Sequence, residues 1–428
     1  MNPAGRPARR IAVVGAGWAG LAAAVEAVRQ GAQVTLFEMS HAAGGRARRV
    51  STTAGDFDNG QHILIGAYSA TLALMRSVGA DPQALLLRQP LTLTYPDGQG
   101  LRLPTGPPML AFVRAVVGAH GWRWSHRLAL LRAATGWLLK GFDCDPRLSV
   151  QQLCADLPAT VLQDLVEPLC VAALNTPAEQ ASARVFLRVL HDALFAGRGS
   201  ADLLLPTAPL SALLPDPAWS WLLAAGADCR AGWRVQSLQR DGAAWQLDGE
   251  AFDGVVLACS AKEATRLAAP VDPRWADKAA ALRYQPIVTV YLADASLRLP
   301  QAMLSLRTGD DAPAQFVFDL GLLGARPGCF AFIVSGAAPW LCQGLAACGQ
   351  AVLQQARSAF AGAFMATDTV QHLSAERRAT FACTPGLDRP PMAIAPALVA
   401  AGDYIAGAYP ATLEGAVRSG IAAAQALT

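Results

Sequence analysis

Residues 11–38 read IAVVGAGWAGLAAAVEAVRQGAQVTLFE. The first four residues, 11–14, are all apolar, which is typical of a buried strand in a parallel sheet. Gly15, Gly17 and Gly20 follow with the spacing G-x-G-x-x-G, and an Ala-rich helical pattern then runs to about residue 28. A second apolar run ends in Glu38. The stretch therefore predicts a strand–helix–strand unit of an α/β fold, with glycines at the turn into the helix.

Each glycine of this turn has a physical role in binding a dinucleotide. Gly15 permits the tight turn, Gly17 has no side chain to obstruct a pyrophosphate, and Gly20 lets the helix pack close to the strand. The start of the helix, at Trp18 and Ala19, offers free N–H groups and the positive end of the helix dipole to phosphates. These five positions are predicted cofactor contacts.

Glu38 supports the same interpretation. It lies 18 residues after Gly20 (38 minus 20), where an acid can accept hydrogen bonds from a ribose 2′-OH. A carboxylate at this position repels a 2′-phosphate, so NADP is disfavoured. Because strand, helix, second strand and acid occur in order, we predict a Rossmann-type dinucleotide-binding domain rather than a chance cluster of glycines.

A second glycine segment, MSHAAGGRARRV at 39–50, comes directly after the acid and contains Gly44, Gly45 and Arg46. It resembles the second half of the dinucleotide motif in the amine oxidase and phytoene desaturase superfamily of flavoproteins. In that superfamily the paired glycines carry the chain over the pyrophosphate and the arginine faces it. The resemblance implies non-covalently bound FAD; the alternative is a glycine turn beside a solvated basic run.

Bulk composition narrows the class of protein. The chain has 428 residues, enough for two domains that share a large core, and its 53% hydrophobic and 16% charged residues make it more apolar than an average soluble protein. Its 35 basic and 32 acidic residues give a net charge of +3, which is too balanced for nucleic-acid binding. The nine cysteines include no C-x-x-C pair, so free thiols in a reducing cytosol are favoured over disulfides or a metal site.

Targeting signals are not evident. Residues 1–10 have no apolar core of a signal peptide, and no uncharged apolar run is long enough to span a bilayer. We therefore expect a cytoplasmic protein.

The string DNGQHILIGAY at 58–68 resembles a narrower group, the squalene-associated FAD-dependent enzymes described as hydroxysqualene dehydroxylases. In the flavin superfamily this segment passes the isoalloxazine ring, which implies that Gly60, Gln61 and His62 lie at the flavin. A single histidine is more often structural, and only the surrounding string favours flavin contact here. The strings at 167–177, 183–195 and 202–206 extend the resemblance into a mostly helical region, 149–215.

The later cofactor segments are also identified by resemblance. Val235, within a short predicted strand at 232–238, matches a residue that flanks the adenine through its backbone, and Ala258 ends a buried strand at 253–259. Gly402 and Asp403 precede a terminal helix, as in the flavin motif in which the acid bonds ribityl or phosphate oxygens and the helix N-terminus stabilises negative charge on the flavin. Further contacts are predicted at the start of that helix, at Leu413, Glu414 and Ala416.

The order of these segments predicts a discontinuous FAD-binding domain made from 9–75, 216–265 and 390–428. The two pieces between them, 76–215 and 266–389, should form an α+β substrate domain. Strands of its sheet are expected at 284–292 and 329–336, and a hairpin is expected around the turn 96–98. A helix is expected at 69–78.

The segment 108–142 combines a helical apolar face with arginines and with Trp122, Trp124 and Trp137. This composition suits a helix that lies in a membrane interface, and it equally suits a helical part of the substrate domain with solvated charges. A long isoprenoid is nearly insoluble in water, so we expect the enzyme to collect it from the inner face of the cell membrane or directly from an upstream synthase. The segment would then lie near the mouth of an apolar tunnel that ends at the flavin.

The resemblance implies reductive removal of the hydroxyl of hydroxysqualene by hydride from reduced FAD, which gives squalene for hopanoid synthesis. Alternatives are an FAD-dependent isoprenoid desaturase or amine oxidase, and a non-catalytic prenyl-binding protein of the same fold. The polar candidates for catalysis in family-like segments are Asn175, Asp192, Asp202 and His62. Each of them could equally be a helix cap or a hydrogen-bond partner in the core.

Overall fold

The structure is a computed structural model that describes residues 8–53, 55–365 and 370–428. The part of the signal-peptide prediction that concerns residues 1–7 lies outside the described residues, as do 54 and 366–369 of the predicted domains. Across the described ranges no helix is long and apolar enough to cross a bilayer.

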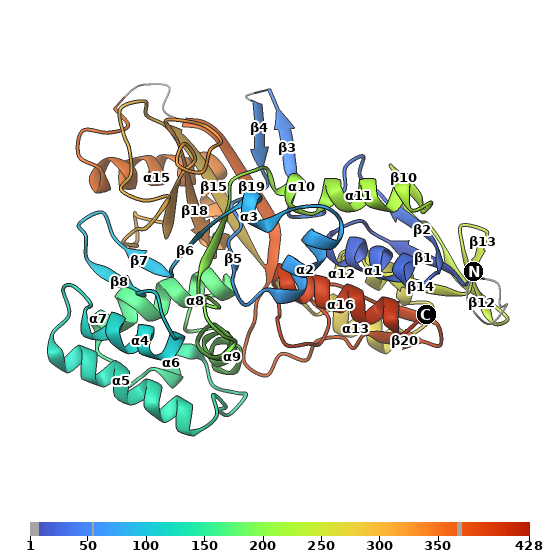
Figure 1. Cartoon of the computed structure of the whole chain (residues 1–428), viewed down its shortest axis with the longest axis horizontal. Helices are drawn as coiled ribbons and strands as arrows, with labels where there is room; N and C mark the ends of the chain where they lie inside the picture. Colours follow the sequence, from blue (N-terminus) through green and yellow to red (C-terminus); the bar gives the residue numbers. More distant parts are fainter. Residues whose placement is uncertain (1–7, 54, 366–369) are drawn as a thin grey trace.

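A six-stranded sheet forms one half of the molecule, in the order β10-β2-β1-β14-β21-β20 (Figure 1). Every neighbouring pair is parallel except the last, β21 with β20. The strands come from three separated stretches of chain: β1 (Arg10–Val14), β2 (Gln33–Glu38), β10 (Asp228–Ala231), β14 (Gly254–Leu257), β20 (Ala393–Ala395) and β21 (Leu398–Ala400). The α/β class and the strands predicted at 11–14, 34–37 and 253–259 are confirmed.

Helices α1 (Trp18–Arg29) and α16 (Leu413–Gln425) pack side by side against this sheet (Figure 1). Their contact is very close, because a Cβ added at Gly420 would lie 2.1 Å from the carbonyl oxygen of Ala19. Helix α11 (Pro215–Ala224) also packs on α1, and α2 (Ser69–Ser77) packs on α16. The N-terminal glycine turn and the C-terminal helix are thereby held together.

A second sheet has five antiparallel strands in the order β16-β17-β18-β15-β19. They are β15 (Tyr284–Ala293), β16 (Met303–Ser305), β17 (Phe316–Asp319), β18 (Cys329–Ser335) and β19 (Val370–Phe381). Alternate residues of β15 point to opposite faces: Val288 and Val290 pack in the cluster under α15 (Leu345–Ala359), whereas Tyr291 joins the main core. The strands predicted at 284–292 and 329–336 are confirmed.

Helices between α4 and α9 form a lobe, which lies below the second sheet at the lower left of Figure 1. They are α4 (Pro108–Val117), α5 (Trp124–Leu139), α6 (Val150–Leu153), α7 (Ala159–Val161), the π-helical turn Leu162–Val166, α8 (Glu167–Leu174) and α9 (Ala183–Phe195). The mostly helical character predicted for 149–215 is confirmed, with one exception: β9 (Leu203–Pro206) is a strand between β5 (Leu64–Ile65) and β6 (Leu86–Gln89).

Hairpins and short helices complete the chain. The turn predicted at 96–98 is present between β7 (Thr92–Thr94) and β8 (Gly100–Arg102). The other short elements are β3 (Arg49–Thr52), β4 (Gly55–Asp58), β11 (Leu238–Asp241), β12 (Ala244–Leu247), β13 (Glu250–Phe252), α3 (Pro82–Leu85), α10 (Leu210–Leu213), α12 (Ala261–Ala268), α13 (Pro273–Ala280) and α14 (Ala338–Gln343).

The strand predicted at 232–238 is wrong, because residues 232–237 form no strand and β11 begins only at Leu238. Side chains form hydrogen bonds with the backbone groups that would otherwise pair with a neighbouring strand. The guanidinium of Arg266 donates to the carbonyl oxygens of Val235 and Gln236, and the carboxylate of Asp248 accepts from the N–H groups of Gln236 and Ser237.

Candidate active site

The first glycine turn forms an open cradle at the carboxyl end of β1. Gly15 has a φ of +103°, and a Cβ there would lie 2.9 Å from the Ala258 carbonyl oxygen. A Cβ on Gly20 would lie only 1.7 Å from the Gly15 carbonyl oxygen. At Gly17, by contrast, the nearest atom to an added Cβ is the Cα of Gly45, 4.0 Å away. Gly15 and Gly20 are therefore required by close packing, and Gly17 leaves space into which a phosphate can approach.

Glu38 is buried beside this turn, at the end of β2. One carboxylate oxygen accepts from the N–H of Ala16 at 2.7 Å, and the other accepts from the N–H of Ser40 at 2.8 Å. A carboxylate oxygen has two acceptor sites, so each oxygen keeps one for a ribose hydroxyl. Glu38 is thus held in place by the loops on both sides of the predicted site.

The second glycine segment lies directly against the first. The N–H of Gly44 donates to the carbonyl oxygen of Ala16 at 2.8 Å, and Gly44 also forms a parallel bridge with Gly17. Gly44 and Gly45 both have positive φ values, +110° and +58°. The chain therefore crosses the N-terminus of α1 through two residues without side chains, as a pyrophosphate-binding loop requires.

Arg46 does not end on this cradle. Its guanidinium forms an ion pair with Asp403 at 2.5 Å and donates to the carbonyl oxygen of Ala379, in β19, at 2.7 Å. The side chain of Asp403 is only 8% exposed. Arg46 therefore links the second glycine segment, the second sheet and the C-terminal motif, and this is a bridging position that spacing alone did not reveal.

The C-terminal segment is ordered by its own polar side chains. The hydroxyl of Ser419 accepts from the N–H of Gly402 at 2.8 Å and donates to the carbonyl oxygen of the same residue at 3.0 Å. Thr412 caps α16 by accepting from the N–H of Gly415. Leu413 and Ala416 lie in the first turn of this helix. The helix α16 therefore begins shortly after Asp403 in the sequence, and the N–H groups of its first turn lie at this end of the helix.

Glu414 has a different environment from the other predicted contacts. Its side chain is fully buried, and it accepts from the N–H groups of Ala70 and Thr71 at 3.0 and 2.9 Å. It also accepts from Arg418 at 2.7 Å. The carboxylate therefore caps the N-terminus of α2, and only the backbone of Glu414 remains for a contact with a cofactor.

The segment 58–62 is attached to the second glycine segment and to the second sheet. The side-chain amide of Asn59 donates to the Arg46 carbonyl oxygen and to Glu376 in β19, both at 3.0 Å. His62 Nδ1 lies 3.1 Å from the carbonyl oxygen of Gly60. Burial, with a further contribution from Arg46, lowers the pKa of His62, so the imidazole is neutral near pH 7. Gln61 lies between them and is half-buried.

Two backbone positions complete the predicted cofactor set. The N–H of Ala258 donates to Val14 at 2.9 Å, which places the end of β14 beside the glycine turn. Val235 is buried, but its carbonyl oxygen accepts from Arg266. Arg266 therefore occupies one of the two acceptor sites of this carbonyl oxygen.

The four catalytic candidates have separate sets of partners. Asn175 is buried, has a φ of +47° at the end of α8, accepts from the N–H of Gly336 and donates to Thr380. Asp202 forms an ion pair with Arg88. Asn175 therefore has a structural role, because it ends α8 and its side chain connects β19 with the residue that follows β18. Asp202 belongs to an ion pair at the surface.

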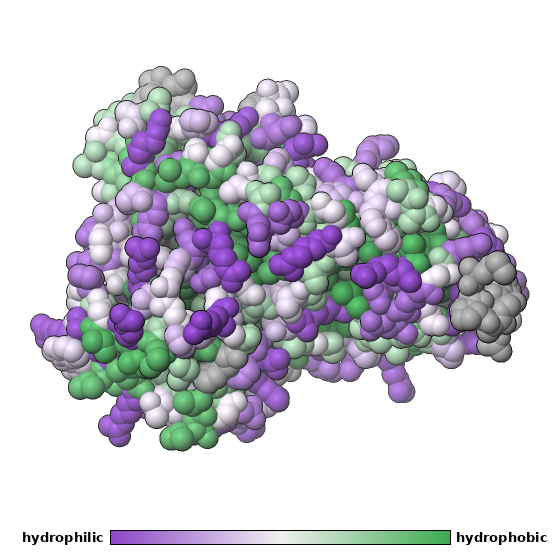
Figure 2. Space-filling view, in the orientation of Figure 1, coloured by the Kyte–Doolittle hydropathy of each residue, from purple (hydrophilic) through white to green (hydrophobic). Residues whose placement is uncertain are grey.

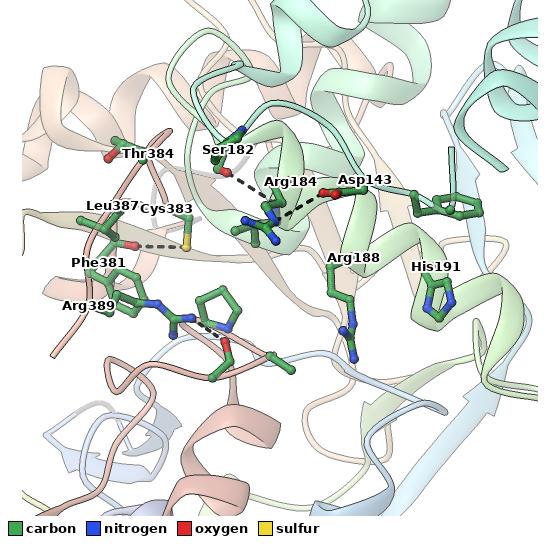
Figure 3. Close-up of a pocket in the computed structure, with 18 residues that line it drawn as sticks. Asp143, Ser182, Arg184, Arg188, His191, Phe381, Cys383, Thr384, Leu387 and Arg389 are labelled. Atoms are coloured by element: carbon green, nitrogen blue, oxygen red, sulfur yellow. Dashed lines mark hydrogen bonds and ion pairs between the residues drawn. The ribbon is translucent and has the colours of Figure 1, made fainter. Parts of the chain in front are cut away.

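Asp192 does not line a pocket itself, but its two partners Arg188 and His191 line one of about 520 Å³ between α9 and the loop that follows β19 (Figure 3). The carboxylate of Asp192 accepts from Arg188 at 3.0 Å and lies 2.9 Å from His191 Nδ1. Burial raises the pKa of Asp192, but hydrogen bonds from His191, Arg188 and Tyr409 outweigh it and lower the pKa overall. Asp192 is therefore a carboxylate that orients its basic neighbours.

The rest of the pocket lining was not predicted from the sequence. Its apolar part consists of aromatic, aliphatic and proline side chains from four separated segments: Phe142, Pro146, Val185, Phe381, Leu387 and Pro410. Arg389 lies on the opposite side from Arg188 in Figure 3 and donates to the carbonyl oxygen of Ile405, close after Asp403. The pocket thus adjoins the C-terminal flavin motif. Its lining residues come from segments far apart in the sequence, so no local sequence pattern predicts that they meet.

Two further groups at the site were also missed. Burial raises the pKa of Asp58 to about 6, against a backbone hydrogen bond from Leu210. Tyr404 is buried directly after Asp403, and its hydroxyl has no partner within the described residues. An open glycine cradle, a buried acid with free acceptor sites and an unpaired buried donor fit a dinucleotide such as FAD. Among the described residues no group of three or more His, Cys, Asp or Glu side chains could hold a metal ion.

Comparisons with known proteins agree with this geometry. Residues 18–428 match the family model of flavin-containing amine oxidoreductases. The chain is 28% identical to a hydroxysqualene dehydroxylase of Sinorhizobium fredii and 27% identical to one of Rhodopseudomonas palustris, in each case over 97% of both chains.

Solved structures share the fold. An oxidoreductase from Methanosarcina mazei superposes with a TM-score of 0.72 at 16% identity and covers 96% of this chain and 99% of its own. Cyclohexylamine oxidase from Brevibacterium oxydans superposes with a TM-score of 0.68 at 19% identity and covers 98% of this chain and 99% of its own. The predictions of an FAD cofactor and of an enzyme rather than a non-catalytic binding protein are confirmed. The chain belongs to the flavin-containing amine oxidoreductase family and is an FAD-dependent oxidoreductase.

Proposed function

We propose that this enzyme is a hydroxysqualene dehydroxylase. The observation that carries the proposal is the similarity to two such enzymes over 97% of both chains, which includes the helical lobe and the pocket as well as the cofactor segments. Bound FAD, in its reduced form, would supply a hydride to the carbon that loses the hydroxyl. The hydroxyl takes up one proton and leaves as water, and the product is squalene.

The pocket beside Asp403 suits this reaction. Departure of an allylic hydroxyl leaves positive charge on carbon, and aromatic rings such as Phe142 and Phe381 in the pocket lining can stabilise this charge. The reaction also needs a proton donor within reach of the hydroxyl. His191 lines the pocket, and its Nδ1 lies 2.9 Å from a carboxylate oxygen of Asp192. In this proposal His191 donates the proton and Asp192 positions it.

The test is anaerobic turnover with photoreduced enzyme. Hydroxysqualene supplied in detergent micelles should be converted to squalene as the flavin spectrum returns to the oxidised form. Products with additional double bonds would instead indicate a desaturase, and flavin reduction by primary amines would indicate an amine oxidase. Flavin that stays reduced in the presence of hydroxysqualene would contradict the proposal.

We further propose that the helical lobe contacts an anionic membrane surface at the cytoplasmic face. Seven large apolar side chains of α4 and α5 are exposed: Leu110, Val113, Val117, Trp124, Leu128, Leu138 and Leu139. We call this set the lobe patch. Green, hydrophobic surface gathers over this lobe at the lower left of Figure 2. Four exposed cations lie on the same two helices or at their ends: Arg114, Arg123, Arg132 and Lys140. The segment 98–142 contains no acidic residue, so its charge complements anionic headgroups.

The predicted membrane role of Trp122 is wrong, because this side chain is buried and its indole N–H donates to Asp164 at 3.1 Å. Trp137 packs against the core and is only partly exposed. Trp124 is 63% exposed, and Arg127 lies over its ring at 4.7 Å. The lobe patch therefore retains Trp124 as its aromatic member, and its end at Leu139 lies three residues from Phe142 in the pocket lining.

Liposome flotation tests this part of the proposal. The double variant Trp124→Ser with Leu128→Ser should bind vesicles of phosphatidylglycerol more weakly than the parent, with unchanged FAD content. Leu223→Ser is the matched control, because Leu223 is 52% exposed but lies on α11, outside the lobe patch. Equal binding by the double variant and the parent would contradict a membrane role and would leave direct transfer from an upstream synthase as the source of substrate.

A further inference from the structure

Tyr404 has a hydroxyl that the protein does not satisfy. The side chain is 2% exposed, and its oxygen has no hydrogen-bond partner among the described residues. Buried polar groups are almost always paired, since leaving one unpaired is destabilising. Such a group beside a cofactor cradle indicates a partner that binds from outside the chain.

The position of the ring is fixed by its neighbours. Tyr404 packs on the backbone before it, since a Cβ added at Gly402 would lie 2.5 Å from Cε1 of the tyrosine. Gly402 itself is tied to Ser419 of α16. The phenol therefore cannot turn to solvent without displacing the C-terminal motif, and its oxygen points to one place.

The groups that influence the hydroxyl come from four separated segments of the chain. Charged and titratable groups that act on it electrostatically are Cys259, Tyr284, Asp403 and Arg46. The backbone of Cys259 lies 2.9 Å from a Cβ added at Gly15, which places this region beside the first glycine turn. Burial raises the pKa of Tyr404 well above its usual value, so the phenol keeps its proton and acts as a donor.

We propose that the Tyr404 hydroxyl is a binding residue for FAD and donates a hydrogen bond to a phosphate or ribityl oxygen of the dinucleotide. A phenol that donates to an anionic phosphate oxygen forms one of the stronger kinds of hydrogen bond. Gly402 and Asp403 would contact the same part of the cofactor through the backbone and the carboxylate. Tyr404 adds a donor that the glycine and acid motifs do not contain.

The experiment compares FAD binding with the stability of the apoprotein. FAD is removed from the full-length Tyr404→Phe variant and from the parent, and each is titrated with FAD while flavin fluorescence is followed. The variant keeps the ring and loses only the donor, so its Kd for FAD should rise about tenfold or more, as expected for a bond to a charged acceptor. Its melting temperature without FAD should equal or exceed that of the parent, because an unpaired buried group has been removed.

The matched control is Tyr95→Phe. Tyr95 is also buried, but its hydroxyl donates to the Asp164 carbonyl oxygen at 3.3 Å, in the helical lobe. This control should lower the melting temperature of the apoprotein and leave FAD affinity unchanged. A Tyr404→Phe variant with parental FAD affinity would overturn the proposal, and so would one whose only defect is the loss of apoprotein stability seen for Tyr95→Phe.

Discussion

Arg46 Nη2 lies 2.5 Å from Asp403 Oδ1, which joins the second glycine segment to the C-terminal motif across 357 residues of sequence. The carboxylate is nearly buried, and its guanidinium partner is 37% exposed. The geometry of the predicted ribityl-binding acid is therefore set by the arginine.

The variant Asp403→Asn should weaken FAD binding by about tenfold and lower the apoprotein melting temperature, because the buried end of the pair loses its charge. Equilibrium titration with FAD and thermal unfolding measure the two effects. The control is Asp145→Asn: Asp145 pairs with Arg147, whose side chain is 85% exposed, so the change should be within about 0.5 kcal/mol. Equal effects of the two variants would show that the Arg46 pair is no more than a surface contact.

Gly20→Ala should prevent the N-terminal unit from folding around FAD. The added Cβ would meet the Gly15 carbonyl oxygen at 1.7 Å, and this clash is with backbone. Gly136→Ala is the control in α5, where an added Cβ meets nothing within 4 Å, so it should stabilise the helix by about 0.5–1 kcal/mol. The yield of yellow, soluble protein and the melting temperature compare the two variants. Parental FAD content in Gly20→Ala would contradict the close packing described here.

Glu414→Gln should lower the free energy of unfolding by about 2–4 kcal/mol. The fully buried carboxylate accepts from two N–H groups at the start of α2 and pairs with Arg418, and a neutral amide can replace only part of this arrangement. Urea unfolding of apoprotein measures the change, with the exposed Glu179→Gln as control. A loss of FAD affinity at unchanged stability would instead assign the Glu414 side chain to the cofactor.

Asp58 should make the protein less stable as pH rises from 4 to 6. Its folded pKa of about 6 is above the ordinary value of 3.8, because burial opposes ionisation. The folded state therefore holds this proton after the unfolded state has lost it. The stability that the proton contributes is complete below pH 4 and is lost as pH passes through 6, up to about 3 kcal/mol in total.

The measurement for Asp58 is the difference in unfolding free energy between the parent and Asp58→Asn at several pH values. Asparagine keeps an acceptor for the N–H of Leu210 and does not titrate. Other titrating groups cancel in this difference, so the variant should become relatively more stable as pH increases and reach a plateau above pH 6. A flat difference across this range would show that the carboxyl titrates normally.

The sequence was sufficient for the features that depend on neighbours along the chain. The glycine turn, the order of strand, helix and acid, and the strands at 284–292 and 329–336 all follow from local periodicity and backbone sterics. Trp122 was misplaced because its partner, Asp164, lies 42 residues away, and an arginine-rich helical context alone favours an interfacial tryptophan. The pocket around His191 and Arg389 could not be predicted, because its walls meet only after both sheets have formed.

The arrangement of the six-stranded sheet has a consequence for biosynthesis. The neighbour of β1 in the sheet, β14, follows some 240 residues later in the chain, and α16, which covers α1, follows later still. Until those segments have been made, the nascent chain presents an unpaired strand edge and an uncovered alanine-rich helix face, a state prone to aggregation and suited to chaperone binding. Because Asp403 is made after β14, the cofactor site stays incomplete until this late segment has emerged, and a flavin that binds earlier would lack its C-terminal contacts.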